Sequence, residues 1–337
     1  MTIKDIAREC GCGLGTVSRA LNNKPGVKPA TKKKILDVVD KYGFVSNSYA
    51  KQLKSQDSHM IAIIIKGATS VMLTSMLTII QKKLETLPYI ANVFVLDEEE
   101  NEAKFANKLY YEQKPVGFIF LGGNPDNYKE DFDKLKIPCV LISTEAESIH
   151  NDYLSSVSID NVSAAEASAD YLISMGHRHI GVIGGFLQHF GVTTKRLQGF
   201  LRSMEKAGIQ FDVDKYYVPC KYSFLDGAAA VKTLMGRCPD VTAVWTMADS
   251  MAIGAIRGLA DLGLSVPKDI SVMGFDGLPL GEFYTPRIST INQEIDDLAI
   301  QGLMLLIREI NNKETPSAEH IIIPFSIMER ETVKSIK

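Results

Sequence analysis

Six polar residues in the C-terminal part of the chain could form a ligand site, because each follows a short apolar segment within a few positions. They are a lysine, a serine, a tyrosine and three aspartates: Lys66, Ser143, Tyr222, Asp97, Asp249 and Asp276. In parallel α/β sheets, ligands bind in the crevice outside the carboxyl ends of the strands. We therefore expect these hydrogen-bonding side chains to line a polar cleft. Asp249 has a structural alternative as N-cap of a helix expected at residues 250–262, and both roles could hold together.

No catalytic constellation accompanies these groups. The chain has no G-x-S-x-G, H-E-x-x-H or paired C-x-x-C motif, and residues 181–185 lack the glycine spacing of a nucleotide loop. His177 and His179 stand at an expected helix–strand corner, where capping or solvent contact is favoured over metal binding. Cys10 and Cys12 lack further thiols for a metal site. We expect no metal and no cofactor; a cytosolic sugar-handling enzyme, such as a kinase or isomerase, is the alternative.

Alternating apolar runs and amphipathic helical patterns must position these groups. Strands are expected at residues 61–65, 90–96, 117–121, 139–142, 180–184, 216–218, 243–247, 271–275 and 321–324. Helices are expected at residues 73–87, 103–112, 164–175, 196–207, 226–235, 250–262 and 295–311. Strands buried on both faces and separated by helices indicate parallel, doubly wound sheets. Nine strands are many for one sheet, and a break near residues 155–161 predicts two similar lobes.

Composition excludes several other classes of protein. The 337 residues predict two or three domains, and 45% hydrophobic with 23% charged residues is typical of a folded globular chain. No apolar run approaches the roughly 18–20 residues that span a bilayer. The N-terminus has no apolar signal core, and the five scattered cysteines fit a reducing compartment. We therefore expect a cytoplasmic protein without a membrane partner.

The charge is unevenly distributed along the chain. The formal net charge is −3, but residues 1–58 hold 11 Lys and Arg against 5 Asp and Glu, or +6. The rest of the chain therefore carries −9. A basic segment attached to an acidic body favours a polyanion partner, because release of counterions from phosphates drives such binding. A solvated lysine-rich helix would explain the charge equally well, so the pattern of the segment must decide.

The basic segment has the pattern of a helix-turn-helix unit. Thr2 and Asp5 have the spacing of a capping box at the start of a first helix. Gly11 can adopt the positive φ of a tight turn, and helices are expected at residues 14–22 and 29–42. The second helix of such a unit lies in the major groove of DNA. Its expected core consists of Ile3, Ile6, Ala7, Val17, Leu21, Ile35, Leu36, Val38 and Val39.

Four short stretches of this segment resemble the LacI/GalR family of bacterial repressors. They are D-I-A at 5–7, T-V-S-R-A-L-N at 16–22, Y-G-F at 42–44 and, as in the family's hinge helix, N-S-Y-A-K-Q-L at 47–53. The resemblance implies that Leu14, Gly15 and Arg19 face base edges and that Leu53 wedges into the minor groove. It assigns further DNA contacts to Thr2, Thr16, Ser18, Asn22, Asn47, Ala50 and Lys51. Ser46 replaces the family's usual proline before the hinge.

The acidic body resembles the effector domain of the same family. Matching stretches include S-I-D-N at 158–161, R-L-Q-G-F at 196–200, V-P-K-D-I-S-V at 266–272, G-F-D at 274–276 and T-I-N-Q at 290–293. By resemblance, Arg196 and Asp276 clamp effector hydroxyls, with Gln293 contributed by the other lobe. The other expected effector contacts are Lys66, Ser143, Tyr222 and Asp249. Ala248 stands where members that bind sugars often carry Asn.

The resemblance implies a complete domain plan. We expect an all-α helix-turn-helix domain at residues 1–45, a hinge at 46–58, and a two-lobed α/β domain of the type I periplasmic-binding-protein kind at 59–337. Lobe 1 would comprise about 59–159 and 291–319, and lobe 2 about 160–290 and 320–337. The predicted function is a transcriptional regulator, expected to be a repressor, that binds a pseudo-palindromic double-stranded DNA operator as a homodimer. A small-molecule effector, expected to be a carbohydrate, would control its operator affinity.

Overall fold

The computed structural model describes residues 3–21, 25–42, 59–67, 69–188, 191–312 and 314–337. The chain divides into two compact units, Met1–Ser58 and His59–Lys337, which are treated separately below. The expected hinge contacts Asn47, Ala50, Lys51 and Leu53 lie outside the described residues, as do Thr2 and Asn22.

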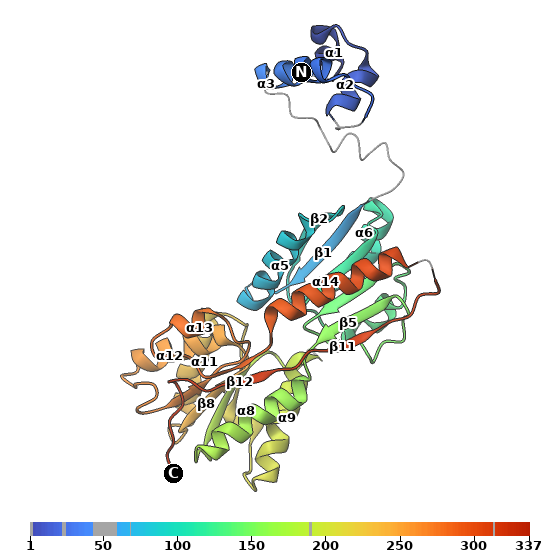
Figure 1. Ribbon diagram of the computed structural model, residues 1–337. Coiled ribbons are helices and arrows are strands. Elements are labelled where there is room, and N and C mark those ends of the chain that lie inside the picture. Colours follow the sequence, from blue (N-terminus) through green and yellow to red (C-terminus); the bar gives the residue numbers. More distant parts are fainter. Residues whose placement is uncertain (1–2, 22–24, 43–58, 68, 189–190, 313) are drawn as a thin grey trace. The chain divides into compact units, whose positions relative to one another are not determined.

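The first unit consists of the three expected helices, α1 (Ile3–Cys10), α2 (Leu14–Leu21) and α3 (Pro29–Lys41) (Figure 1). Gly11 has a φ of +60°, so the predicted tight turn after α1 is confirmed. The core is formed by apolar side chains of all three helices: Ile6, Ala7, Cys10, Val17, Ala20 and Ile35. Leu36, expected in this core, is 39% exposed. Since successive helical residues are about 100° apart, the side of α3 that buries Ile35 leaves Leu36 facing solvent.

The first lobe of the second unit contains a six-stranded parallel sheet in the order β11-β5-β4-β3-β1-β2 (Figure 1). Its strands are β1 (Met60–Lys66), β2 (Ile90–Leu96), β3 (Gly117–Leu121), β4 (Cys139–Ile142), β5 (Leu154–Ser158) and β11 (His320–Ile322). Its helices are α5 (Val71–Leu84), α6 (Glu102–Gln113), the short η1 (Pro125–Tyr128) and α7 (Lys129–Phe132), and α14 (Ile295–Asn311). The fully buried runs in β1, β3 and β4 are those expected of central parallel strands.

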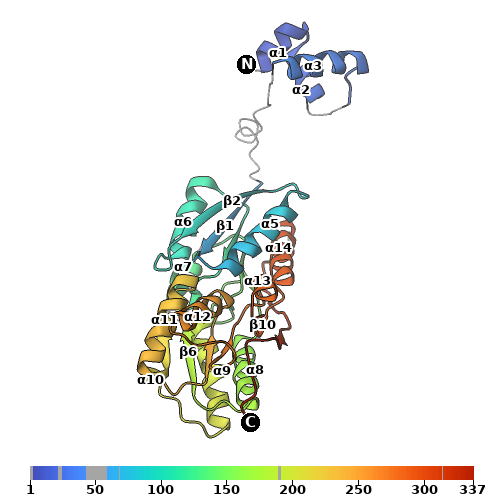
Figure 2. The same ribbon diagram turned by 90° about the vertical axis from the view of Figure 1, so that its left-hand side faces the viewer.

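The second lobe repeats the plan with a four-stranded parallel sheet in the order β7-β6-β8-β9. Its strands are β6 (Ile180–Gly184), β7 (Tyr217–Pro219), β8 (Ala243–Thr246) and β9 (Ser271–Met273). Its helices are α8 (Asn161–Ser174), α9 (Val192–Lys206), α10 (Val213–Tyr216), α11 (Phe224–Arg237), α12 (Asp249–Asp261) and α13 (Leu280–Phe283) (Figure 2). β10 (Thr290–Asn292) and β12 (Ser326–Met328) pair antiparallel where the chain passes between the lobes. The predicted two-lobed, doubly wound architecture is confirmed.

Two sequence-based boundaries need correction. Residues 155–161 were expected to form a break, but Leu154–Ser158 is a fully buried strand. Three of the five residues of this strand are serines. Two of these, Ser155 and Ser156, have partners for their hydroxyls inside the protein. Residues 320–322 were assigned to lobe 2, but β11 pairs with β5, so the chain stays in the first lobe until about Ile323.

Glu309 on α14 makes the stability of this unit depend on pH. The Ser155 hydroxyl donates to its carboxylate, and burial raises the pKa of Glu309 from 4.5 to about 7. Between these values the folded protein retains a proton that the unfolded chain has released, so its stability falls as pH rises. We expect Glu309→Gln, which keeps an acceptor for Ser155, to raise the melting temperature above pH 7 and to change it little below pH 4.5. Thermal melts across this range test this, and parallel pH profiles for both proteins would contradict it.

Candidate functional site

The exposed side of α2 carries the residues predicted to read DNA bases. Val17 and Ala20 are buried against α1 and α3, which fixes the rotation of the helix. Leu14, Gly15 and Arg19 are consequently exposed. Leu14 is 46% exposed, an unusual position for a leucine in a small three-helix unit with so few core residues. These three residues thus meet the first requirement for base contact, which is access from outside.

The two polar residues expected to touch phosphates lie at the edges of this surface. Thr16 and Ser18 are both half-buried on α2. Lysines exposed on the same unit add positive charge around the helices: Lys4, Lys28, Lys33, Lys34 and Lys41. A basic unit with a projecting short helix can hold the DNA backbone through charge while α2 meets the bases.

The second unit contains a cavity between its lobes, with an empty volume of about 890 Å³ that includes solvent at its mouth. Residues after the strands of both sheets form its wall, as expected for ligand sites at the carboxyl ends of parallel strands. Lobe 1 contributes Lys66, Gly67, Ser70, Met72, Leu73, Glu98, Gly122, Gly123, Asn124, Ser143 and Thr144. Lobe 2 contributes Gly185, Phe186, Val192, Thr193, Arg196, Cys220, Tyr222 and Asp276. Five of the seven predicted effector residues, Lys66, Ser143, Arg196, Tyr222 and Asp276, are therefore brought together around one cavity.

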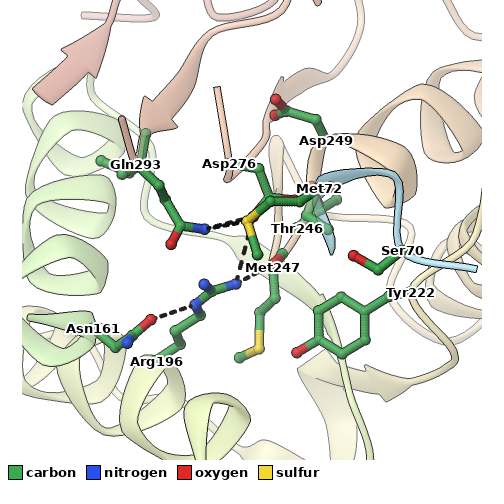
Figure 3. A network of polar contacts seen from close by, with 12 residues as sticks. Ser70, Met72, Asn161, Arg196, Tyr222, Thr246, Met247, Asp249, Asp276 and Gln293 are labelled. Carbon is green, nitrogen blue, oxygen red and sulfur yellow. Dashed lines mark hydrogen bonds and ion pairs between the residues drawn. The ribbon is translucent and has the colours of Figure 1, made fainter. Parts of the chain in front are cut away.

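Arg196 is the buried cation on the lobe 2 side of this cavity (Figure 3). Only 3% of its surface is exposed. Its Nε donates to Asn161 Oδ1 at 2.9 Å, and its Nη1 donates to the Met247 carbonyl at 2.7 Å. The guanidinium lies 3.8 Å from the centre of the Phe275 ring. Nη1 is also 4.0 Å from Asp276 Oδ1. These contacts hold the guanidinium plane in one orientation, which suits directed hydrogen bonds to a ligand.

Asp276 lies beside Arg196 on a strained backbone, with a φ of +120°. Gln293 Nε2 donates to its Oδ1 at 2.7 Å and also contacts the Met72 sulfur at 3.3 Å (Figure 3). Burial raises the pKa of Asp276, and the neighbouring Arg196 opposes that rise. A ligand hydroxyl offers such a carboxyl group a partner in either protonation state. Maintaining a non-glycine residue at this φ is typical of a functional position.

Lys66 forms the corresponding buried cation in lobe 1, but it is already paired. Its Nζ lies 2.7 Å from Glu102 Oε2, and the side chains are 4% and 0% exposed. The Asn124 amide donates to the other carboxylate oxygen at 2.7 Å. The lysine also lies 4.8 Å from the Tyr128 ring centre. A Cβ on Gly123 would approach Glu102 to 2.7 Å, so the glycine, with φ +121°, makes room for this carboxylate.

Tyr222 and Ser143 lie on opposite lobes of the cavity wall. The Tyr222 hydroxyl is 2.9 Å from Thr193 Oγ1, and burial raises the pKa of Tyr222. Ser143 has a φ of +70°, and its amide donates to the Val157 carbonyl at 2.9 Å. Together they provide an aromatic ring and hydroxyls, a common combination around sugar-like ligands.

Asp249 is not on the cavity wall, contrary to expectation. Its carboxylate accepts from the Leu278 amide at 2.7 Å and from Thr290 Oγ1 at 2.6 Å, which ties α12 to the segments before α13 and at β10. Burial raises its pKa. The helix begins at Asp249 itself, with Ala248 as N-cap residue, so the capping interpretation is wrong as well.

Two further residues expected at the cavity, Gln293 and Asp97, are not on its wall either. Gln293 lies behind the wall and orients Asp276, as described above, instead of facing the cavity. Asp97, placed in the cleft from its position after β2, is exposed, while the next residue, Glu98, lies on the wall. The Asp97 amide donates to Glu100, so the chain turns here and carries Asp97 away.

Several wall residues were not predicted from the sequence. Ser70 is the N-cap of α5 and Thr193 lies in the first turn of α9, while Asn124 follows β3. Lys66 is selected because ligands bind at the carboxyl ends of parallel strands, which we call the strand-end rule. Residues 122–124 also follow a strand, so the same rule could have predicted them as wall residues. Glu102 carried no comparable signal, because it is one of several acidic residues between 98 and 102.

Two absences in the described part of the chain concern metal-binding groups and membrane-spanning helices. No group of three or more His, Cys, Asp or Glu side chains there could hold a metal ion. None of the described helices is both long and apolar enough to cross a membrane.

Comparison with known proteins agrees with this geometry. Residues 2–47 match the domain described as bacterial regulatory proteins, lacI family, and residues 169–333 match a periplasmic binding protein-like domain. The chain is 32% identical to the HTH-type transcriptional regulator MalR of Clostridium butyricum, over the full length of both proteins. The chain belongs to the LacI family. It is also 30% identical to catabolite control protein A of Priestia megaterium, over 99% of each chain.

The fold of this LacI-family chain is shared by solved structures. The Lac repressor bound to ONPG matches with a TM-score of 0.80, 21% identity and 99% coverage of each chain. The complex of the regulator CelR with cellobiose matches with a TM-score of 0.72, 24% identity, and coverage of 98% of this chain and 99% of the other. Membership of the family makes the protein a DNA-binding transcriptional regulator and excludes the enzyme alternative.

Proposed function

We propose that this regulator is a cytoplasmic homodimeric repressor that reads a pseudo-palindromic operator and changes its operator affinity when a carbohydrate binds between its lobes. The observation that carries the effector assignment is the buried Arg196, held in one orientation beside Asp276 on the wall of a cavity large enough for a sugar. A guanidinium and a carboxyl group together donate and accept hydrogen bonds, which suits neighbouring hydroxyls.

The DNA part of the proposal rests on the exposed side of α2. Arg19 can make the paired contact to guanine O6 and N7. Leu14 and Gly15 offer no side-chain hydrogen bonds, so they would read shape and apolar contacts such as a thymine methyl group. Thr16, Ser18 and Asn22 are proposed to position the helix on phosphates, together with Thr2. The hinge residues Asn47, Ala50, Lys51 and Leu53 are proposed to contact the minor groove between the two half-sites.

An apolar patch on lobe 2 supports a second copy of this chain as a partner. Phe224 and Leu225 begin α11, and Leu280 and Phe283 lie on α13; their exposed fractions are 38%, 85%, 45% and 84%. Helix α11 packs on α12, with the Phe224 carbonyl against Gly254, and the segment just before α13 is tied to the start of α12 by the bond from the Leu278 amide to Asp249. Exposed apolar side chains gathered in this way are typical of interfaces.

Phe283→Asp is expected to weaken dimerisation by about thirtyfold or more, since a central aromatic residue contributes roughly 2 kcal/mol or more to an interface. Sedimentation velocity across a concentration series measures this. Leu262→Asp is the matched control, because Leu262 is 48% exposed and follows the far end of α12. Equal dimer affinity in both variants would remove this patch from the proposed interface.

The proposed function as a whole is tested by selecting DNA from a random library with the purified full chain. We expect a two-fold symmetric consensus, bound with an affinity that falls steeply as salt rises, because several phosphate contacts release counterions. A screen of sugars by thermal shift should then yield a ligand that stabilises the protein. Failure to enrich any symmetric sequence would contradict the regulator's proposed mode of binding.

A further inference from the structure

We infer that the cleft is built for an uncharged carbohydrate and discriminates against phosphorylated and carboxylated sugars. This inference rests on the proposed function, because it specifies the ligand class of the same cleft. It follows from the charges on the cleft wall and from the partners that already neutralise the cations.

Lys66, the buried cation of lobe 1, is committed to Glu102. Their 2.7 Å contact is almost fully removed from solvent, and the Asn124 amide holds the second carboxylate oxygen. An anionic ligand that recruited Lys66 would leave Glu102 buried without its counter-ion, which is strongly unfavourable. Lys66 can therefore donate a hydrogen bond to a neutral group but is poorly suited to neutralise a phosphate.

Arg196, the buried cation of lobe 2, already uses two of its hydrogen-bond donors within the protein. Its Nε and Nη1 donate to Asn161 and Met247, and Asp276 supplies a carboxyl group 4.0 Å away. Ligand hydroxyls can bond to this pair by donating to Asp276 and accepting from the remaining guanidinium hydrogens. A ligand carboxylate would instead place a second acid beside Asp276, and one of the two acids would have to keep its proton.

At the rim of the cleft, too, a cation is already paired with an acidic side chain. Lys195 on α9 forms an ion pair with Glu145, which follows β4, so this contact joins the two lobes beside the wall residues Arg196 and Thr144. Glu98 on the wall has no ion-pair partner among the described residues. Within the described part of the chain, the cations at the cleft are thus paired and one carboxylate is not. An approaching anion therefore meets the Glu98 carboxylate and finds each of the described cations at the cleft already beside an acidic side chain.

The experiment compares matched neutral and anionic sugars by isothermal titration calorimetry and by the fluorescence of Trp245, the single tryptophan of the chain. Its ring stacks on Phe200 and meets Phe275 edge-on, and Phe275 in turn lies against the Arg196 guanidinium. The pairs are glucose with glucose 6-phosphate, ribose with ribose 5-phosphate, galactose with galacturonate, and cellobiose with cellobionate. We expect at least one neutral sugar to bind about thirtyfold more tightly than its anionic counterpart.

Equal or tighter binding of an anionic sugar would overturn this inference and leave the proposed carbohydrate function intact. If no member of any pair binds, both the inference and the carbohydrate assignment fail. The two failures are therefore distinguishable from one data set.

Glu98→Gln tests the electrostatic cause. Removing the unpaired carboxylate should reduce the preference for the neutral sugar by about threefold to tenfold, an effect that salt also weakens. Glu99→Gln is the matched control, since it removes the same charge from an exposed neighbouring position that is not on the wall. An equal change in both variants, or no change in Glu98→Gln, would contradict a role of wall charge.

Discussion

Arg196→Lys is expected to abolish the response of operator binding to the effector while leaving operator binding itself unchanged. Lysine keeps the positive charge but lacks the planar fork that holds Asn161 and the Met247 carbonyl in defined directions. Hydrogen bonds to charged groups contribute roughly 1.5–3 kcal/mol each, so loss of two bonds from the guanidinium to effector hydroxyls should weaken effector affinity at least about 100-fold. Titration of the effector against a fluorescent operator complex measures both properties.

Arg202→Lys on the same helix is the control for this variant, because Arg202 is half-exposed and its guanidinium lies 3.4 Å from Glu166, away from the cavity wall. It should respond to effector as the unmodified protein does. A purely structural role for Arg196 would lower the melting temperature and operator affinity together. A normal effector response in a folded Arg196→Lys protein would contradict the proposed clamp.

Arg19→Ala is expected to lower affinity for the selected operator far more than affinity for unrelated DNA. A paired arginine–guanine contact discriminates by about 1–3 kcal/mol, or roughly 5- to 150-fold, and a symmetric operator contains two half-sites. The loss for a dimer should therefore approach the square of the single-site value. Competition shift assays with operator and scrambled duplexes provide the measurement.

The control for Arg19 is Arg8→Ala, which removes the same charge from α1, where Arg8 is 84% exposed and 4.0 Å from Asp5. This variant should lower the affinity for operator DNA and for scrambled DNA by a similar small factor, as expected when only a charge is lost. If Arg19→Ala behaved in the same uniform way, α2 would not be the helix that reads the operator.

Much of the fold followed from hydrophobic pattern because the central strands are buried on both faces. Strands 90–96, 117–121, 139–142 and 180–184 and helix 295–311 have the expected bounds. The pattern failed at Leu154–Ser158, where the hydroxyls of Ser155 and Ser156 bond to the distant residues Glu309 and His320. Such compensation depends on tertiary contacts, and no local sequence signal reports it. The pairing of β11 with β5, across more than 150 residues, was missed for the same reason.

The sequence predicted where the cavity lies, but it predicted less well which side chains face it. The strand-end rule placed Lys66, Ser143, Tyr222 and Asp276 correctly on the wall. It could not separate Asp249, which faces inward to Leu278 and Thr290, from residues that face the cavity. Direction after a strand depends on the turn that follows. The pairing of Lys66 with Glu102, which sets the charge of the cleft, required the three-dimensional structure.

The central claim is that occupancy of the cleft controls operator affinity. The most direct measurement is operator affinity at zero and saturating concentrations of the neutral sugar found by calorimetry, together with affinity for that sugar in the presence and absence of operator. Linkage requires both affinities to change by the same factor, typically about 5- to 150-fold. We predict equal factors. Tight sugar binding with an unchanged operator affinity would contradict the account.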